Sequence, residues 1–271
     1  MIAYLGKVDD LSLRTSARNP LLEIVDDPKK VDGAYAHQYD NLAREFKALL
    51  PSRAFLAEVG CGKGQLTIPL AKLNTKYRFD LVDTFAGPYA GTLRELKQGL
   101  LHARLKQRVR IHEMDYLDWI SDEFSDKYTA VISSEFLPEI DSYELKMFIP
   151  EVYRVLRRGG RTIHSYLSST PRNSRQRLLI EADSDPAWTK TPPKEWFSPK
   201  PHLVMSKLKQ AGFENVRIKR AKSNLIIRSQ AVQEIPETWD IKRSFWKKYR
   251  DRLVKDGLEL PDWIIISGSK S

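Results

Sequence analysis

The chain has 271 residues, of which 41% are hydrophobic and 30% charged, and this composition predicts a globular protein with a sizeable core. No apolar run reaches the ~18 residues that a membrane span needs, no secretory signal is visible, and one cysteine excludes an internal disulfide. We therefore expect a cytoplasmic protein without a membrane span. The net charge of +10 is compatible with binding to nucleic acid, an acidic protein, a membrane surface or an anionic metabolite. Basic helix faces that are simply solvated would give the same charge.

The first 50 residues are expected to form a helical cap. Residues 1–30 mix apolar and polar side chains and predict a loosely packed leader. From Val31 to Leu50, apolar side chains recur three and four residues apart, which predicts a helix that ends at Pro51. Tyr35 and Tyr39 lie on this stripe. Such a stripe is commonly part of a core, but the two tyrosines could also fold over a ligand as a lid.

The central motif is AFLAEVGCGKGQLT at residues 54–67, which predicts a buried strand, a tight turn and the start of a helix. Gly60, Gly62 and Gly64 remove every Cβ from the turn, so a ligand can approach the backbone and the free N–H groups of the helix. A dinucleotide fingerprint needs its last glycine at position 65, where this chain has Gln65, and the spacing therefore argues against a pyrophosphate cofactor. The alternative interpretation, a glycine-rich turn that binds no ligand, remains. Cys61 has no partner at metal-ligand spacing, so we predict no metal site.

Acidic residues end the next two predicted strands. The strand at residues 77–82 stops at Asp83, 23 positions after Gly60, where a carboxylate can accept hydrogen bonds from both hydroxyls of a ribose. The strand at residues 109–113 is followed by Asp115, which could accept from the exocyclic amine of adenine while Met114 or Tyr116 covers the ring.

Strands continue to alternate with helices, which predicts a parallel sheet with helices on both faces. The further strands are expected at residues 128–133, 161–166, 214–220, 224–228 and 262–267, and the further helices at 65–73, 89–106, 143–156, 203–210 and 237–255. Residues 168–200 are rich in proline and polar side chains and form a predicted insertion with one short helix. Within it, Trp188, Trp196 and Phe197 either cap the core or line a substrate pocket, because large aromatic side chains are costly to expose.

The motifs EVGCGKG, LVD, HEMDY, VISSEFLPE and YRVLRRGG, in this order, resemble those of the class I S-adenosylmethionine-dependent methyltransferases. The resemblance covers residues 31–166, with Arg158 where proline is usual. It implies one α/β domain over residues 1–271, with a Rossmann-like sheet of seven strands in the order 3-2-1-4-5-7-6 and helices on both faces. The last strand would run antiparallel between the fifth and the sixth. A whole helix before that strand departs from the plain family pattern.

Carried onto this sequence, the resemblance implies a site for S-adenosyl-L-methionine. Glu58, Gly60 and Gly62 would contact its amino acid end, Asp83 the ribose and Asp115 the adenine amine. Ser133 to Phe136 would border the methyl group. The full set of expected cofactor-binding residues is Tyr35, Tyr39, Glu58, Gly60, Cys61, Gly62, Asp83, Thr84, Met114, Asp115, Tyr116 and Ser133.

Methyl transfer from a sulfonium is an in-line displacement on an activated carbon, so proximity and alignment supply most of the effect and a base is optional. Glu135, His164 and Tyr166 lie near strand ends and are candidate bases, or else structural polar groups. The resemblance implies a transferase that methylates a small-molecule acceptor. RNA or protein methylation stays an alternative because of the basic surface, as does a non-catalytic binding module, and the oligomeric state is not predicted.

Overall fold

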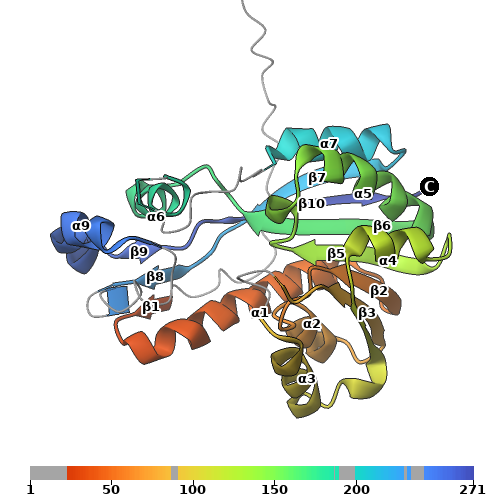
Figure 1. Cartoon of the computed structure of the whole chain (residues 1–271), viewed down its shortest axis with the longest axis horizontal. Helices are drawn as coiled ribbons and strands as arrows, with labels where there is room; N and C mark the ends of the chain where they lie inside the picture. The colour runs from red at the N-terminus through yellow and green to blue at the C-terminus, as the bar shows by residue number, and fades with distance from the viewer. Residues whose placement is uncertain (1–22, 87–90, 186, 189–198, 229–230, 233–240) are drawn as a thin grey trace, which may run out of the picture.

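The computed structural model describes residues 23–86, 91–185, 187–188, 199–228, 231–232 and 241–271. Its centre is a seven-stranded sheet in the order β4-β3-β2-β5-β6-β10-β7 (Figure 1). The strands are β2 (Ala54–Val59), β3 (Tyr77–Asp83), β4 (Val109–Glu113), β5 (Tyr128–Ser134), β6 (Leu156–Leu167), β7 (Glu214–Ala221) and β10 (Trp263–Ser269). Strands β2 to β6 pair in parallel, and β10 runs antiparallel to both β6 and β7. Counted within this sheet, the order is 3-2-1-4-5-7-6, so the predicted fold class and the antiparallel last strand are confirmed.

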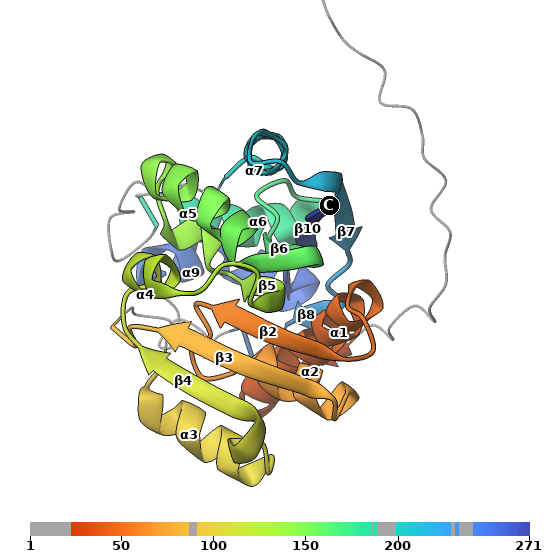
Figure 2. The same ribbon diagram turned by 90° about the vertical axis from the view of Figure 1, so that its right-hand side faces the viewer.

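Helices cover both faces of this sheet (Figure 2). They are α1 (Val31–Leu49), α2 (Thr67–Leu73), α3 (Leu93–His102), α4 (Tyr116–Asp122), α5 (Ser142–Val155) and α7 (Pro201–Gln210). Side chains of a strand alternate between the two faces. Leu56 and Phe79 therefore join the core under α1, α2 and α3, whereas Ala57 and Val131 join the core under α4, α5 and α7. The central strands β2, β3 and β5 are buried on both sides, as inner strands of a parallel sheet require, whereas the edge strands β4 and β7 are largely accessible.

Capping residues begin three of these helices. Thr92 before α3 and Asp141 before α5 each form a capping box with the glutamate three residues later. Asp115 caps α4 by accepting from the backbone N–H groups of Leu117 and Asp118. Helix α4 is an unpredicted element, since seven residues are too few for a clear helical period.

A second, three-stranded sheet was not predicted. It consists of β1 (Glu23–Val25), β8 (Leu225–Ile227) and β9 (Leu258–Glu259), in the order β1-β8-β9. With α6 (Ser174–Ser184) and α9 (Arg243–Asp256) it forms what we call the small lobe, whose own core contains Val25, Leu178 and Phe245. Figure 1 places this lobe beyond the carboxyl ends of β5 and β6.

The small lobe corrects two expectations. Residues 23–30 are not part of a loose leader, because β1 pairs in parallel with β8 and the 3-10 helix η1 (Pro28–Lys30) leads into α1. The strand expected at 224–228 exists as β8, but it belongs to the second sheet.

Two further findings concern the rest of the chain. The strand expected at 161–166 begins five residues earlier, at Leu156. No helix in the described part of the chain is long and apolar enough to cross a membrane.

Candidate active site

The glycine turn and the end of β3 form one hydrogen-bonded unit. Gly60 and Cys61 donate their backbone N–H groups to the carbonyl oxygen of Val82, at 2.9 and 3.3 Å. Gly62 donates to Oδ2 of Asp83 at 2.8 Å, and Phe85 donates to Oδ1 of the same carboxylate at 2.7 Å. The structure therefore brings the predicted Asp83 against the predicted turn, and the carboxylate itself helps to hold that turn.

Positive φ angles explain the glycines of the turn. Gly60, Gly62 and Gly64 have φ of 69°, 48° and 83°, in the left-handed region that favours glycine. A Cβ on Gly60 would lie only 2.8 Å from the ring of Phe136, and one on Gly64 would lie 2.9 Å from Leu96 on α3. These two glycines thus let the residue after β5 and the helix α3 approach the turn closely.

Glu58 lies directly below this turn and is buried, with 1% of its surface exposed. Its carboxyl accepts a hydrogen bond from the Thr67 hydroxyl at the start of α2. Burial, reinforced by the charge of Asp83 and opposed by the Thr67 hydroxyl, raises the pKa of Glu58 from 4.5 to about 8. Glu58 is therefore largely protonated at neutral pH. Cys61 is also buried, and burial followed by Glu58 and Asp83 raises the pKa of its thiol, so the thiol is neutral too.

The end of β4 lies beside the end of β3, because the N–H of Met114 donates to the carbonyl of Asp83 at 3.2 Å. Asp115 follows, with its Oδ1 used as the cap of α4. Tyr116 packs edge to face against Phe136 and Phe148, at 4.8 and 5.5 Å between ring centres. Thr84 is exposed next to Asp83. The expected adenine and ribose residues are thus adjacent in space.

Helix α1 brings its two tyrosines to the end of β5. Tyr35 and Tyr39 meet edge to face at 5.7 Å, and Tyr39 also packs on Trp263 at 5.4 Å. Burial, followed by the neighbouring Tyr35 and Glu135, holds the pKa of the Tyr39 hydroxyl well above its ordinary value. Tyr39 is therefore a neutral phenol beside the Glu135 carboxylate.

Of the three candidate bases, only Glu135 is not fully buried. It has a φ of 58°, a strained value for a residue other than glycine, and its Oε1 accepts from the N–H of Leu167 at 2.7 Å. His164 has no exposed surface, and its two ring nitrogens hydrogen-bond to Ser133 at 2.7 Å and Thr162 at 2.6 Å. Burial lowers the pKa of His164 to about 3, so it is a neutral core side chain, and Ser133 is its partner inside the sheet.

Tyr166 is likewise a core residue, since it is 1% exposed and donates to the carbonyl of Pro199 at 2.9 Å. Trp188, expected on the substrate side, packs in the small lobe against Phe245 and Tyr249, at 5.5 and 6.1 Å between ring centres. That contact agrees with the core-capping alternative. Trp196 and Phe197 lie outside the described residues.

Two residues near the turn escaped the sequence analysis. Thr67 hydrogen-bonds to Glu58, but a threonine at the start of a helix carries no particular signal. Glu139 lies on the 3-10 helix η3 (Leu137–Glu139) after β5, and partial desolvation of its carboxyl together with the charge of Asp83 raises its pKa. Only the turn of the chain after Glu135 brings Glu139 toward Asp83, and nothing in the local pattern predicts it.

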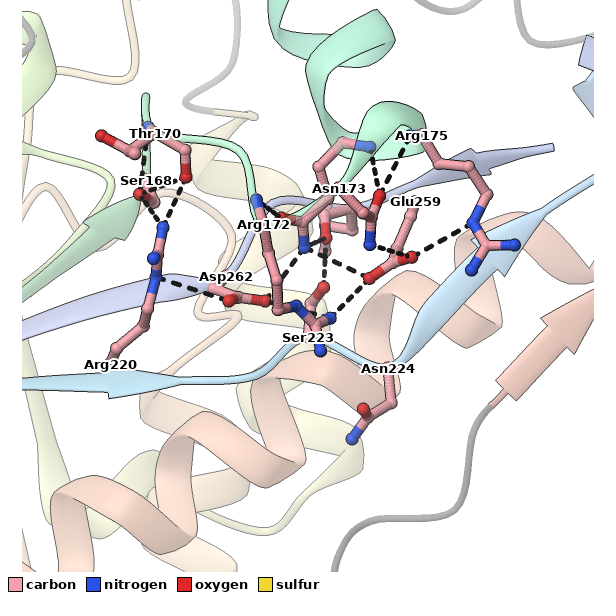
Figure 3. A network of polar contacts seen from close by, with 12 residues as sticks. Ser168, Thr170, Arg172, Asn173, Arg175, Arg220, Ser223, Asn224, Glu259 and Asp262 are labelled. Carbon is pink, nitrogen blue, oxygen red and sulfur yellow. Dashed lines mark hydrogen bonds and ion pairs between the residues drawn. The ribbon is translucent and has the colours of Figure 1, made fainter. Parts of the chain in front are cut away.

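An ionic cluster around two buried carboxylates joins the small lobe to the large sheet (Figure 3). Its centre is two carboxylates, Glu259 of β9 and Asp262 just before β10, which are 3% and 1% exposed. Glu259 accepts from Arg172 at 2.5 Å and from Arg175 at 3.3 Å. The other members are Asn173, Gln176, Arg220 and Ser168.

The cluster reaches the candidate site through the backbone. The N–H of Ser168 donates to the carbonyl of Asp262 at 2.8 Å, and its neighbour Leu167 donates to Glu135. The small lobe is thus tied to the end of β6, which hydrogen-bonds to Glu135 after β5.

One group could in principle hold a metal ion, since ligand atoms of Asp80, His112 and Glu123 all lie within 4.8 Å of one another. The ammonium of Lys127 already lies 3.1 Å from Asp80 and 2.6 Å from Glu123. Because Lys127 supplies the compensating positive charge, we assign no metal to this group.

Comparisons with known proteins agree with this architecture. Residues 56–160 match a family model described as a methyltransferase domain. No curated protein matches the chain by sequence.

Similar solved structures include a SAM dependent methyltransferase from Archaeoglobus fulgidus, with 14% identity over 87% of this chain and 94% of that chain and a TM-score of 0.55. A cyclopropane-fatty-acyl-phospholipid synthase-like protein from Lactobacillus casei has a TM-score of 0.62 at 13% identity, over 87% and 90% of the two chains. A phosphoethanolamine N-methyltransferase 2 from Haemonchus contortus, solved with phosphomonomethylethanolamine and S-adenosylhomocysteine, has a TM-score of 0.56 at 14% identity, over 88% and 57%. At these identities the likeness concerns the fold.

The family model spans the glycine turn, both acidic strand ends and β5, which are the features that the sequence motifs indicated. The match over residues 56–160 identifies a methyltransferase domain in this chain, and solved S-adenosyl-L-methionine-dependent methyltransferases share its fold, which supports S-adenosyl-L-methionine as the cofactor.

Proposed function

We propose that this enzyme transfers the methyl group of S-adenosyl-L-methionine to a small-molecule acceptor at the carboxyl ends of β5 and β6. The observation that carries the proposal is the convergence of Tyr39 from α1 and Glu135 just after β5, next to Phe136 that packs on the glycine turn, with the small lobe tied to β6. Such a lobe beyond the strand ends suits an acceptor small enough to be enclosed.

The residues around the turn fit the cofactor. A carboxylate oxygen has two acceptor positions, and Gly62 and Phe85 use one on each oxygen of Asp83. One position on each oxygen is then left for the two ribose hydroxyls. Asp115 uses Oδ1 for its cap, so the adenine amine would take Oδ2. S-Adenosyl-L-methionine supplies an activated methyl group, and the protein supplies alignment.

Glu135 is the best candidate for a base or for orienting the acceptor. Tyr39 and Tyr166 remain phenols because burial and Glu135 raise the pKa of both, so these hydroxyls are hydrogen-bond donors. We propose no catalytic part for His164 or Tyr166, whose polar atoms are bonded inside the core.

Replacing Asp83 tests the cofactor site. Asp83→Asn keeps one oxygen for the turn but loses the charge, and charge-assisted hydrogen bonds contribute about 1.5 to 3 kcal/mol. We expect the Kd for S-adenosyl-L-methionine to rise by about one to two decades in calorimetry, with the far-ultraviolet circular dichroism unchanged. An unchanged Kd would remove Asp83 from the site.

The acceptor class can be tested by transfer of a radiolabelled methyl group to fractions of a cell extract. We expect label in the fraction of small metabolites, with wild-type enzyme and not with Asp83→Asn at limiting cofactor. Label in the RNA or protein fraction instead would replace the small-molecule acceptor by a polymer. Absence of cofactor binding altogether would favour a non-catalytic module.

A further inference from the structure

Helix α9 of the small lobe has a strongly basic exposed surface. Its 14 residues, RSFWKKYRDRLVKD, contain six cations and two acids, which gives a net charge of 6 − 2 = +4. The six cations are Arg243, Lys247, Lys248, Arg250, Arg252 and Lys255, and all six side chains are exposed. A large part of the excess positive charge of the whole chain is therefore concentrated on one helix.

Packing fixes which way this helix faces. Phe245, Trp246 and Leu253 are buried in the core of the small lobe, so the helix cannot turn its basic side inward. Figure 1 shows α9 at the far end of the small lobe, beyond the carboxyl ends of β5 and β6. The exposed basic side of α9 therefore faces away from the core of the small lobe.

These charges are largely uncompensated inside the protein. Within the described residues, none of the six cations takes part in an ion pair. Two of them have other contacts: Lys248 lies 5.0 Å from the ring centre of Trp188, and Arg252 donates to the carbonyl of Ser174 at 3.3 Å. The remaining four are available to an anionic surface.

We propose that the exposed basic side of α9 docks the protein on a membrane that contains anionic phospholipids. A helix with four to eight Lys and Arg on one side is attracted to the negative surface of such a membrane. The exposed aliphatic Val254 lies among these cations and can enter the headgroup region. Because α9 lies at the outer end of the small lobe, docking would place that end of the molecule against the lipid surface (Figure 1).

Single-stranded RNA fits this side less well. Proteins that bind single strands combine cations with exposed aromatic rings on which bases stack. The rings of α9 are unavailable for stacking, because Phe245 and Trp246 are buried and Tyr249 packs against Trp188 and Phe245. The outward side of α9 offers charge and an aliphatic side chain instead.

Sedimentation with lipid vesicles tests the proposal on the full chain. We expect binding to phosphatidylcholine vesicles with about 30% phosphatidylserine, little binding to pure phosphatidylcholine, and weakening with added salt. The triple variant Arg243→Gln, Lys247→Gln, Lys255→Gln should bind the anionic vesicles on the order of 100-fold more weakly, since each charge contributes about fivefold. All three side chains are exposed, so the thermal melting temperature should change little.

A matched control separates the helix from the overall charge. Arg94→Gln, Lys97→Gln, Lys106→Gln removes three exposed cations in and after α3, and this variant should bind anionic vesicles nearly as well as the wild type. Equal loss in the two triple variants would overturn the proposal, as would no binding at low salt. Binding to single-stranded RNA that depends on α9 and exceeds vesicle binding would identify the partner as nucleic acid instead. Membrane docking does not depend on which acceptor is methylated, so either proposal can fail alone.

Discussion

At the scale of single residues, Gly60 shows how backbone conformation and packing act together. Gly60 and Gly159 have almost the same φ, 69° and 71°, but a Cβ on Gly60 would meet Phe136 at 2.8 Å whereas one on Gly159 has no neighbour within 4 Å. Left-handed φ alone costs an alanine about 1 to 2 kcal/mol. The same substitution at Gly60 and at Gly159 therefore separates the effect of backbone strain from the effect of a steric contact.

We predict that Gly159→Ala lowers the free energy of unfolding by about 1 kcal/mol and leaves cofactor binding unchanged. Gly60→Ala should lower it by a further 1 to 3 kcal/mol, roughly, because the Phe136 ring must move. Urea unfolding of the two variants checks the difference. Adding Phe136→Leu should restore part of the free energy of unfolding that Gly60→Ala loses, and should restore none in Gly159→Ala. If alanine destabilises the protein equally at residues 60 and 159, the contact between a Cβ at residue 60 and Phe136 is contradicted.

The Glu58 carboxyl predicts a pH dependence of stability. Its pKa is about 8 in the folded protein against 4.5 ordinarily, so the folded state keeps a proton that the unfolded state releases. The resulting stabilisation is complete below pH 4.5 and is lost as the pH rises to about 8. His164 changes stability in the opposite direction, because its pKa is lowered from 6.5 to about 3 in the folded protein. It lowers the free energy of unfolding only as the pH falls below 6.5, where the unfolded state takes up a proton and the folded state does not. His164 therefore does not offset the effect of Glu58 between pH 6.5 and 8, and the comparison with Glu58→Gln removes the contribution of every other group, including Glu139.

We predict that the free energy of unfolding falls between pH 6.5 and 8 in the wild type relative to Glu58→Gln, measured by urea unfolding at several pH values. Glutamine keeps an oxygen that can accept from Thr67 and removes only the titration. If the difference between the two proteins stays constant with pH, Glu58 is already ionised in the folded state.

At the scale of the elements, the ionic cluster fastens α6 and β9 to the large sheet. Glu259 is 3% exposed, whereas the side chains of its partners Arg172 and Arg175 are 34% and 40% exposed. If Glu259 lost its charge, water could still partly solvate the two guanidinium groups. The loss in the free energy of unfolding should therefore be smaller than for a fully buried ion pair.

We predict that Glu259→Gln lowers the free energy of unfolding by about 1 to 3 kcal/mol. The control is Asp126→Asn, which breaks the pair with Lys270, because Asp126 is 62% exposed and such pairs contribute about 1 kcal/mol or less. Thermal and urea unfolding measure both. Equal small effects would mean that the cluster does not fasten the small lobe.

Elements with a clear period were predicted well, and short or composite ones were not. The stripe of α1 and the apolar strands β2, β3 and β5 follow local rules, so their positions were close to the expected ones. β1 has three residues and β9 two, and neither carries a pattern of its own. They exist because strands from distant parts of the chain pair side by side.

At the scale of the whole molecule, the cofactor site and the small lobe are distinct regions. We predict that saturating S-adenosyl-L-methionine slows amide hydrogen exchange at residues 60–64, 83–85 and 115–118, because the ligand would contact these backbone segments. The amides of α9 should be unaffected and serve as the internal control. Mass spectrometry resolves these peptides; protection confined to the small lobe would place the cofactor elsewhere.

Local signals in the sequence were enough to predict strands that alternate with helices, a glycine turn and carboxylates at two strand ends, because apolar periodicity, glycine and strand-end residues act over a few neighbouring positions. The strand order and the role of those strand ends in cofactor binding were implied by the resemblance of the motifs to the methyltransferase family. Only the tertiary structure decided which polar residues are accessible: His164 and Tyr166 enter the core, while Glu135 stays at the strand end. It also decided that α6, α9 and three short strands form a second core, because burial and strand pairing between distant segments depend on the whole chain.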